Sequence, residues 1–123
     1  MAKVLIIEDD PYVRRFYGRL FKFKKYDVDM AENGADGITK AKANLPDLIL
    51  LDIIMPVMNG LEVLEKLKHD PMTENCVVVM LTNLGDKDVV NKAMTLGAGG
   101  IIIKSNAPPE SLLKIVDKYL AAK

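Results

Sequence analysis

Short apolar runs recur along the chain, and polar or turn-forming residues bound each of them. Four of the runs are continuous and rich in branched side chains: residues 4–7, 48–51, 77–81 and 101–103. Continuous apolar runs that are too short for a helix are typical of parallel strands covered on both faces. Residues 26–30 (YDVDM) alternate apolar and polar side chains instead. This alternation indicates a strand with one solvated face, which we expect at the edge of a sheet.

Apolar residues at helical spacing occupy the stretches between these runs. The clearest stripes cover residues 13–21 and 112–120, where apolar side chains recur at i, i+3, i+4 and i+7. The dipeptide Asp10-Pro11 precedes the first stripe, and the proline pair 108–109 opens the second. An aspartate N-cap followed by proline at the first helical position is a common helix start. Both stretches are therefore predicted to be amphipathic helices.

Three further helical patterns complete an alternation of strands and helices. One helix is predicted from about residue 59 to 69 and is stopped by Pro71, and weaker patterns cover residues 34–43 and 86–96. Strands that alternate with helices of this length form βαβ crossovers, and therefore a parallel sheet with helices on both faces. We predict a single α/β domain over residues 1–123, built on a doubly wound, five-stranded parallel sheet.

Composition limits the classes of function. Half of the residues are apolar and 28% are charged, as in ordinary globular proteins. Seventeen basic and seventeen acidic residues cancel, which argues against a general binder of nucleic acids or of membrane surfaces. The first residues do not resemble a signal peptide, and no apolar run is long enough to span a membrane. With a single cysteine as well, we expect a soluble cytoplasmic protein with no nucleic-acid or membrane partner.

Polar side chains gather where the apolar runs end. The acids Glu8, Asp9 and Asp10 follow the first run, and the later strands are followed in turn by Asp52, Thr82 and Lys104. The carboxyl ends of parallel strands meet at one edge of the sheet, where this class of fold binds its ligands. Carboxylates packed together repel unless a cation joins them, and an oxygen-only cluster suits Mg²⁺. Such a site beside an ammonium and a hydroxyl could hold a phosphoryl group, with Asp52 as the natural nucleophile.

Each of these residues also has an ordinary structural interpretation. Asp52 could form a turn or cap a helix, Lys104 could protect an edge strand, and Thr82 could be a plain strand residue. The acids after the first run could simply favour the positive N-terminal end of the next helix. These separate structural roles would place all of the residues at one edge of the sheet by coincidence, whereas a single phosphoryl site explains all of them. We therefore favour the phosphoryl site.

The same residues resemble the receiver domains of two-component response regulators. The similarity is carried by residues 4–10 (VLIIEDD), residues 50–56 (LLDIIMP), Asn59-Gly60, Leu81-Thr82, and Gly97-Ala98 leading to Lys104. It spans essentially the whole chain, in the same order and at the same spacing. The resemblance implies a flavodoxin-like fold with strand order 2-1-3-4-5, and the edge position of the alternating second strand agrees with that order.

The resemblance also implies a phosphorylation site. Asp52 would be the phosphoacceptor, taking a phosphoryl group from the phosphohistidine of a histidine kinase or histidine phosphotransfer protein. Asp9 and Asp52 would bind Mg²⁺ directly, Glu8 would act through water, and the backbone carbonyl of Ile54 would complete the site. Such a protein is not an enzyme in the usual sense, because it catalyses only its own phosphorylation and dephosphorylation.

A conformational switch is a further implication of the resemblance. Thr82 would reorient towards the phosphoryl group and Lys104 would pair with it, which would change the affinity for a partner. Receivers usually have an aromatic residue at the position of Ile101, so the isoleucine puts the aromatic part of this switch in doubt. They also have a cis proline after the lysine, whereas Ser105 stands here. We expect a trans peptide because a cis bond to serine costs about 2.5–4 kcal/mol.

Two aliphatic residues flank the expected phosphorylation site. Ile54 and Leu84 lie two residues beyond Asp52 and Thr82. Neither side chain can orient a water molecule for attack on an acyl phosphate, and we therefore expect slow autodephosphorylation. The alternatives to a receiver are an aspartyl-phosphate-forming phosphohydrolase and a degenerate receiver that acts only as an interaction module. Ile54 stands where such hydrolases carry a second acid, and none of the receiver's acids, its threonine or its lysine is missing.

Basic residues without intervening acids lie between Pro11 and Lys25. They form either a solvated helix face or, as the resemblance suggests, the surface that docks a histidine kinase. No arginine occurs after Arg19. The arginine salt bridges by which winged-helix regulators dimerise are therefore not obviously available, and we expect a monomer. No output segment follows the last predicted helix, so we expect a stand-alone regulator with an unidentified output partner.

Overall fold

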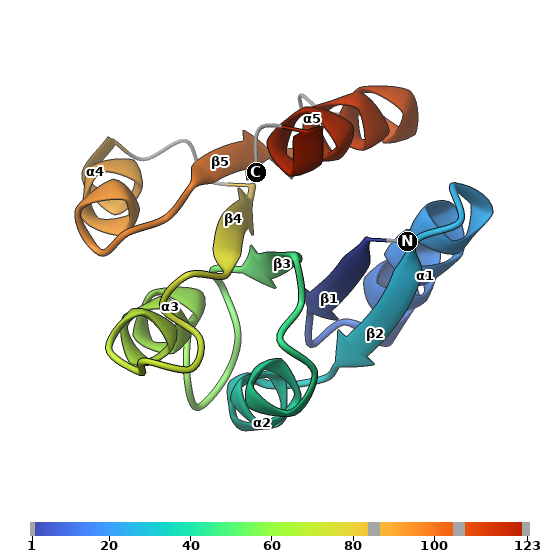
Figure 1. Ribbon diagram of the computed structural model, residues 1–123. Coiled ribbons are helices and arrows are strands. Elements are labelled where there is room, and N and C mark those ends of the chain that lie inside the picture. Colours follow the sequence, from blue (N-terminus) through green and yellow to red (C-terminus); the bar gives the residue numbers. More distant parts are fainter. Residues whose placement is uncertain (1, 84–86, 105–107, 122–123) are drawn as a thin grey trace.

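The computed structural model describes residues 2–83, 87–104 and 108–121, and within them five strands alternate with five helices (Figure 1). The strands are β1 (Lys3–Ile7), β2 (Asp27–Ala31), β3 (Leu48–Asp52), β4 (Val77–Thr82) and β5 (Gly100–Ile103). The helices are α1 (Pro11–Phe23), α2 (Gly34–Asn44), α3 (Gly60–Lys68), α4 (Lys87–Thr95) and α5 (Pro109–Ala121). Every strand and helix expected from the sequence is therefore present, with small differences at the ends.

The strands form one parallel sheet in the order β2-β1-β3-β4-β5. Figure 1 shows α1 and α5 on one side of this sheet and α2, α3 and α4 on the other. This is the doubly wound, flavodoxin-like arrangement, so the expected fold class and strand order are confirmed. β2 lies at an edge, as its alternating sequence indicated.

Two apolar clusters cover the two faces of the sheet. In β1, Leu5 and Ile7 belong to the cluster beneath α2, α3 and α4, whereas Val4 and Ile6 belong to the cluster beneath α1 and α5. Successive residues of a strand point to opposite faces, which is why the central strands are apolar throughout. In the part of the chain that the structure describes, no helix is long and apolar enough to cross a membrane.

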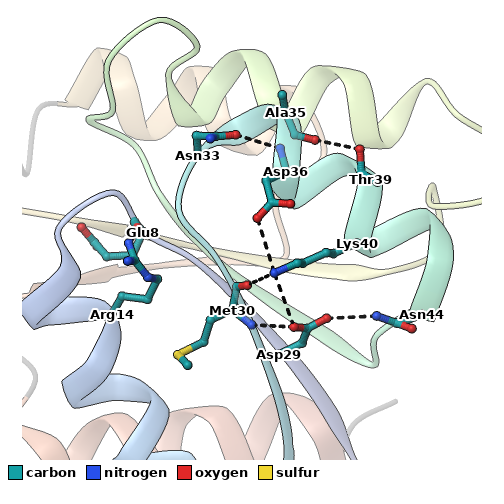
Figure 2. A network of polar contacts seen from close by, with 10 residues as sticks. All are labelled: Glu8, Arg14, Asp29, Met30, Asn33, Ala35, Asp36, Thr39, Lys40 and Asn44. Atoms are coloured by element: carbon teal, nitrogen blue, oxygen red, sulfur yellow. Dashed lines mark hydrogen bonds and ion pairs between the residues drawn. The ribbon is translucent and has the colours of Figure 1, made fainter.

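The edge strand β2 presents polar groups to α2. The Asp29 carboxylate lies 3.8 Å from the Lys40 ammonium and accepts a hydrogen bond from Asn44 Nδ2 at 3.0 Å. Lys40 Nζ also lies 3.4 Å from Asp36 and donates to the Met30 carbonyl (Figure 2). These ion pairs are partly exposed and contribute little net energy, but charged groups at an edge discourage pairing with the strand of another chain.

The loop between β3 and α3 brings the start of the helix against the end of the strand. A capping box begins α3, because Asn59 accepts from the Glu62 amide at 3.0 Å and Glu62 accepts from the Asn59 amide at 3.4 Å. The Gly60 amide donates to the Ile53 carbonyl at 2.7 Å. A Cβ at position 60 would lie 2.3 Å from the Asp52 carbonyl oxygen, so only glycine permits this approach.

We predict that Gly60→Ala lowers the free energy of unfolding by about 2 kcal/mol, because the added methyl group meets backbone atoms that cannot move aside. Gly18→Ala is the matched control. There the added Cβ would lie 2.6 Å from Met30 Sδ, which belongs to a flexible side chain, and alanine favours the helix. Urea denaturation followed by circular dichroism measures both variants, and equal losses of stability would contradict this account.

Candidate metal centre

Four polar side chains lie at the carboxyl ends of the strands. Asp52 is the last residue of β3 and is paired with Leu81 of β4, so that Thr82 lies one residue further along the sheet. Glu8 directly follows β1, and Lys104 directly follows β5. Because all the strands are parallel, these residues share one edge of the sheet although they are distant in the sequence.

Three carboxylates come together at this edge, those of Glu8, Asp9 and Asp52. One oxygen atom of each lies within 4.8 Å of the other two. Glu8 is 2% exposed and Asp52 is 6% exposed, while Asp9 is the most accessible of the three. The donors are all oxygen atoms, which Mg²⁺ prefers, and the accessible side leaves room for the water molecules that Mg²⁺ retains. These residues therefore fit a hard divalent cation.

Lys104 lies beside two of the carboxylates. Its Nζ is 3.1 Å from Glu8 Oε2 and 3.5 Å from Asp52 Oδ1. Burial lowers the pKa of the Lys104 ammonium group, but the carboxylates of Asp52 and Glu8 raise it by more, and the net direction is upward. Lys104 therefore stays charged at neutral pH and balances one of the three negative charges.

The negative charge that Lys104 does not balance affects the pKa of Glu8. Burial raises the pKa of the Glu8 carboxyl to about 7, and the Asp52 carboxylate adds to the rise, although Lys104 opposes both. Without a cation, the cluster relieves its repulsion by keeping a proton on Glu8. Excess negative charge in a buried, oxygen-lined site is the electrostatic condition under which a divalent cation binds.

Hydrogen bonds within the loop between β1 and α1 hold the first two acids in place. Asp10 caps α1 by accepting from the Tyr12 amide at 2.8 Å, which confirms the N-cap expected from the sequence. The Asp10 amide donates to Glu8 Oε1 at 3.2 Å. From α1, the Arg14 guanidinium donates to the Glu8 carbonyl at 2.8 Å. The loop that carries Glu8 and Asp9 is thus tied both to itself and to the helix that follows.

The other expected site residues differ in their surroundings. Thr82 is 1% exposed at the end of β4. Ile54, two residues beyond Asp52, exposes 57% of its surface in the loop before α3. Ile101 is half-buried in β5, pairs with Met80, and packs against the apolar cluster beneath α2, α3 and α4. Thr82 thus directly follows the β4 residue that pairs with Asp52, and Ile54 lies two residues after Asp52 in the chain. Ile101 packs in the core instead.

Three expectations concern residues outside the described part of the chain. Ser105, Leu84 and Asp86 all lie there. The trans peptide after Lys104, the role of Leu84 beside the phosphorylation site and the start of the fourth helix at residue 86 therefore stay predictions.

Two residues of α1, Arg14 and Tyr17, interact with the residues of this site, which their sequence patterns did not predict. Arg14 was counted among the basic residues of the docking surface, but it is half-buried and bonded to the loop. Tyr17 was assigned to the apolar stripe. Burial raises the pKa of its phenol, and Lys104 is close enough to oppose the rise. Arg14 lies three, four and seven residues before the buried residues of α1, so helical spacing places it on the buried face, although its charge favours an exposed position. For Tyr17, periodicity indicates the buried face but not where the phenol oxygen reaches.

The doubly wound, five-stranded sheet is the fold of CheY-like receiver domains of known structure. The family model of the response regulator receiver domain matches residues 4–117. The chain belongs to this family, and it is a receiver domain of the two-component, phosphorelay type.

Named relatives agree with this assignment. Chemotaxis protein CheY of Treponema pallidum is 38% identical over 105 residues, which are 83% of this chain and 72% of that protein. Nitrate/nitrite response regulator protein NarL of Escherichia coli is 39% identical over 123 residues, 98% of this chain but 55% of that protein. The structure of chemotaxis protein CheY4 of Vibrio cholerae has a TM-score of 0.91 at 28% identity and covers 97% of this chain and 98% of its own. The chain therefore spans most of the CheY proteins but only about half of NarL.

We predict that the metal-free protein loses stability as the pH rises from 4.5 to about 7. In the unfolded chain, Glu8 releases its proton near its ordinary pKa of 4.5, whereas the folded protein retains that proton up to about pH 7. The folded state thus binds more protons in this window, so that a rise in pH favours unfolding. The loss attributable to Glu8 is on the order of 3 kcal/mol, fully present above the window and absent below it.

Thermal unfolding in EDTA at about pH 5 and about pH 8 measures this effect. Glu8→Gln should remove most of the dependence on pH, because it leaves no carboxyl group to titrate. Glu65→Gln, at an exposed position of α3, is the control and should retain it. A metal-free protein whose stability increases through this window would show that the buried carboxyl is not protonated in the folded state.

Proposed function

We propose that the protein, as one receiver domain over residues 1–123, accepts a phosphoryl group on Asp52 from the phosphohistidine of a histidine kinase or a histidine phosphotransfer protein. The observation that carries this proposal is the meeting of Asp52 with Glu8, Asp9 and Lys104. The three carboxylates have oxygen atoms within 4.8 Å of one another, and Lys104 Nζ is 3.5 Å from Asp52 Oδ1. Membership of the receiver family supports the same reaction.

Mg²⁺ is the cofactor of the proposed reaction. Asp9 and Asp52 would hold it directly, Glu8 through water, and Ile54 through its backbone carbonyl. When bound, the ion supplies positive charge that offsets the charge on the phosphoryl oxygens. The chain brings the ligands together before the ion arrives, since Glu8 and Asp52 are buried at the ends of neighbouring strands.

In the transfer step, an Asp52 carboxylate oxygen forms a bond to phosphorus while the phosphorus–nitrogen bond of the phosphohistidine breaks. The electron pair of the broken bond returns to the imidazole nitrogen. Lys104 is already beside Asp52 and Glu8, so its ammonium can pair with a phosphoryl oxygen without a large movement. The modified aspartate carries up to about two negative charges instead of one, and this added charge is what the switch detects.

Thr82 and Ile101 are the proposed switch residues. Thr82 is buried next to the site, and its side chain would exchange its present interactions for a hydrogen bond to the phosphoryl group. Ile101 has no polar group, so it can respond only by repacking against its neighbours in the core, among them Met80. This exchange would change the surface around β4 and β5 and with it the affinity for an output partner.

The exposed basic side of α1 is the proposed docking surface for the kinase or phosphotransfer protein. Arg19 and Lys22 are exposed there, between Pro11 and Lys25, and α1 begins directly after the loop that carries two of the acids. A partner that presents acidic groups around its phosphohistidine would be complementary to this surface. Arg14 does not contribute to it, because its guanidinium is bonded to the loop.

Two other functions use the same residues. A phosphohydrolase with an aspartyl nucleophile would form the same intermediate but hydrolyse it continuously, and a degenerate receiver would only bind partners. Ile54 disfavours the hydrolase, because an exposed aliphatic side chain stands where a second acid would be required. The intact set of carboxylates with Lys104 disfavours the degenerate receiver.

We predict that acetyl phosphate and Mg²⁺ add one phosphoryl group to Asp52 and that EDTA prevents the reaction. Intact-protein mass spectrometry measures the gain, and peptide mapping locates it. Asp52→Asn should abolish labelling because the nucleophile is lost, whereas Asp27→Asn, at an exposed position of β2, should not. Continuous phosphate release would support the hydrolase, no reaction would support the degenerate receiver, and labelling of Asp52→Asn at the wild-type rate would exclude Asp52 as the acceptor.

The phosphorylated protein is predicted to lose its phosphoryl group slowly, because the aliphatic side chain of Ile54 cannot orient a water molecule. Ile54→Asn should accelerate the loss about tenfold, below the effect of a general base. Val57→Asn is the control, since Val57 is exposed in the same loop and its positive φ of 68° suits asparagine. Phosphate release after removal of the donor gives the rates, and an unchanged or slower rate for Ile54→Asn would contradict the explanation.

A further inference from the structure

Arg14 belongs to the first turns of α1, but its side chain turns back to the loop between β1 and α1. Its Nη1 donates to the Glu8 carbonyl at 2.8 Å and to the Asp9 carbonyl at 3.3 Å. The residue is half-buried, and Figure 2 shows its guanidinium beside Glu8. These hydrogen bonds join Arg14 to the backbone of two proposed metal ligands.

The location of Arg14 is electrostatically unfavourable for its own helix. The amino end of α1 carries partial positive charge, and a cation there is destabilising. Charge-assisted hydrogen bonds to carbonyl oxygens can offset this effect, and Arg14 makes two of them. The next residue, Arg15, is exposed. The inward direction is thus a property of Arg14 and not of the basic helix as a whole.

The two carbonyls that Arg14 contacts belong to the peptide groups on either side of the Asp9 Cα atom. A peptide group is planar, so holding both of these groups limits the backbone angles of Asp9 and the direction in which its side chain leaves the chain. Asp9 needs such support more than its neighbours, because it is the most accessible of the three acids. Glu8, by contrast, is held by Lys104 and by the Asp10 amide.

We propose that Arg14 is a positioning residue for the metal centre, which holds the backbone on both sides of Asp9 so that its carboxylate stays close to those of Glu8 and Asp52. The inference rests on the proposed binding of Mg²⁺ and adds a residue that does not touch the ion. Groups of this kind change metal affinity about 10–100-fold when they are removed.

Two physical effects of Arg14 on Mg²⁺ have opposite signs. A positive charge near the site repels the cation, so that removing the charge alone would strengthen binding. Loss of the hydrogen bonds would release the Asp9 backbone and weaken binding. The direction of the change in affinity therefore separates positioning from simple electrostatics.

The experiment compares Arg14→Met with Arg15→Met, since both remove one positive charge from neighbouring positions of α1. Titration with MgCl₂, followed by amide NMR shifts of the metal-site residues, gives the dissociation constant. We expect it to rise about tenfold in Arg14→Met and to stay unchanged or fall slightly in Arg15→Met. In metal-free protein, amide hydrogen exchange at residues 8–10 should accelerate in Arg14→Met only. If Arg14→Met fails to fold, Arg14→Lys serves instead, because lysine keeps the positive charge but its ammonium extends less far than the guanidinium and should not make both contacts.

Mg²⁺ affinity equal to or tighter than wild type in the folded Arg14 variant would overturn the inference, and so would an equal loss in Arg15→Met. These results would leave the proposed function intact as long as the wild-type protein binds Mg²⁺. A wild-type protein that does not bind the ion would overturn the metal part of the proposed function and this inference with it. Thermal unfolding in EDTA confirms that a weakened variant is folded.

Discussion

Repulsion among like charges is the constraint on which the rest of this site depends. Glu8, Asp9 and Asp52 lie close enough to share one cation, yet Lys104 balances only one of their charges. Lys104 and, below about pH 7, the proton on Glu8 relieve part of this repulsion, and the fold must oppose the rest. The parallel register of β1, β3 and β4 supplies the main support, because it brings residues that are far apart in the sequence to one edge. The close packing of Gly60 under Asp52 adds a second support.

The parts of this fold that follow from short-range patterns were predictable. Strands buried on both faces need continuous apolar side chains, and the runs that became β1, β3 and β4 have them. The edge strand β5 is also a continuous apolar run, although one of its faces is only half-buried. Asp27 and Asp29 interrupt β2, because an edge strand has a side that meets solvent and α2. Parallel strands place Asp52 and the acids after β1 at the same edge of the sheet, and they cluster because β1 and β3 are neighbours in the strand order that the resemblance implied. The parallel sheet and its acidic edge could therefore be predicted from the residues alone, whereas the full strand order and the choice of Glu8, Asp9 and Asp52 as the cluster came from the resemblance to receiver domains.

The remaining features depend on directions that side chains adopt only in the packed molecule. Arg14 and Arg15 are adjacent and chemically identical, yet one bonds to the loop and the other is exposed. Tyr17 fits an apolar stripe by its ring, while the influence of Lys104 on the pKa of its phenol depends on how α1 lies against the sheet. Helical spacing can place Arg14 on the buried face of α1, but it does not show that the guanidinium turns back to the loop.

A receiver of this kind must remain ordered without a cation and still leave its carboxylates available to one. Lys104 meets the first requirement at a cost to the second, because its ammonium occupies oxygens of Glu8 and Asp52. An arginine directed at the same oxygens would compete with Mg²⁺ in the same way. Arg14 is directed instead at the carbonyls on either side of Asp9. It can therefore order the most exposed acid of the cluster while the carboxylate of that acid stays available to a cation, which would explain how a basic helix can begin beside the proposed metal site.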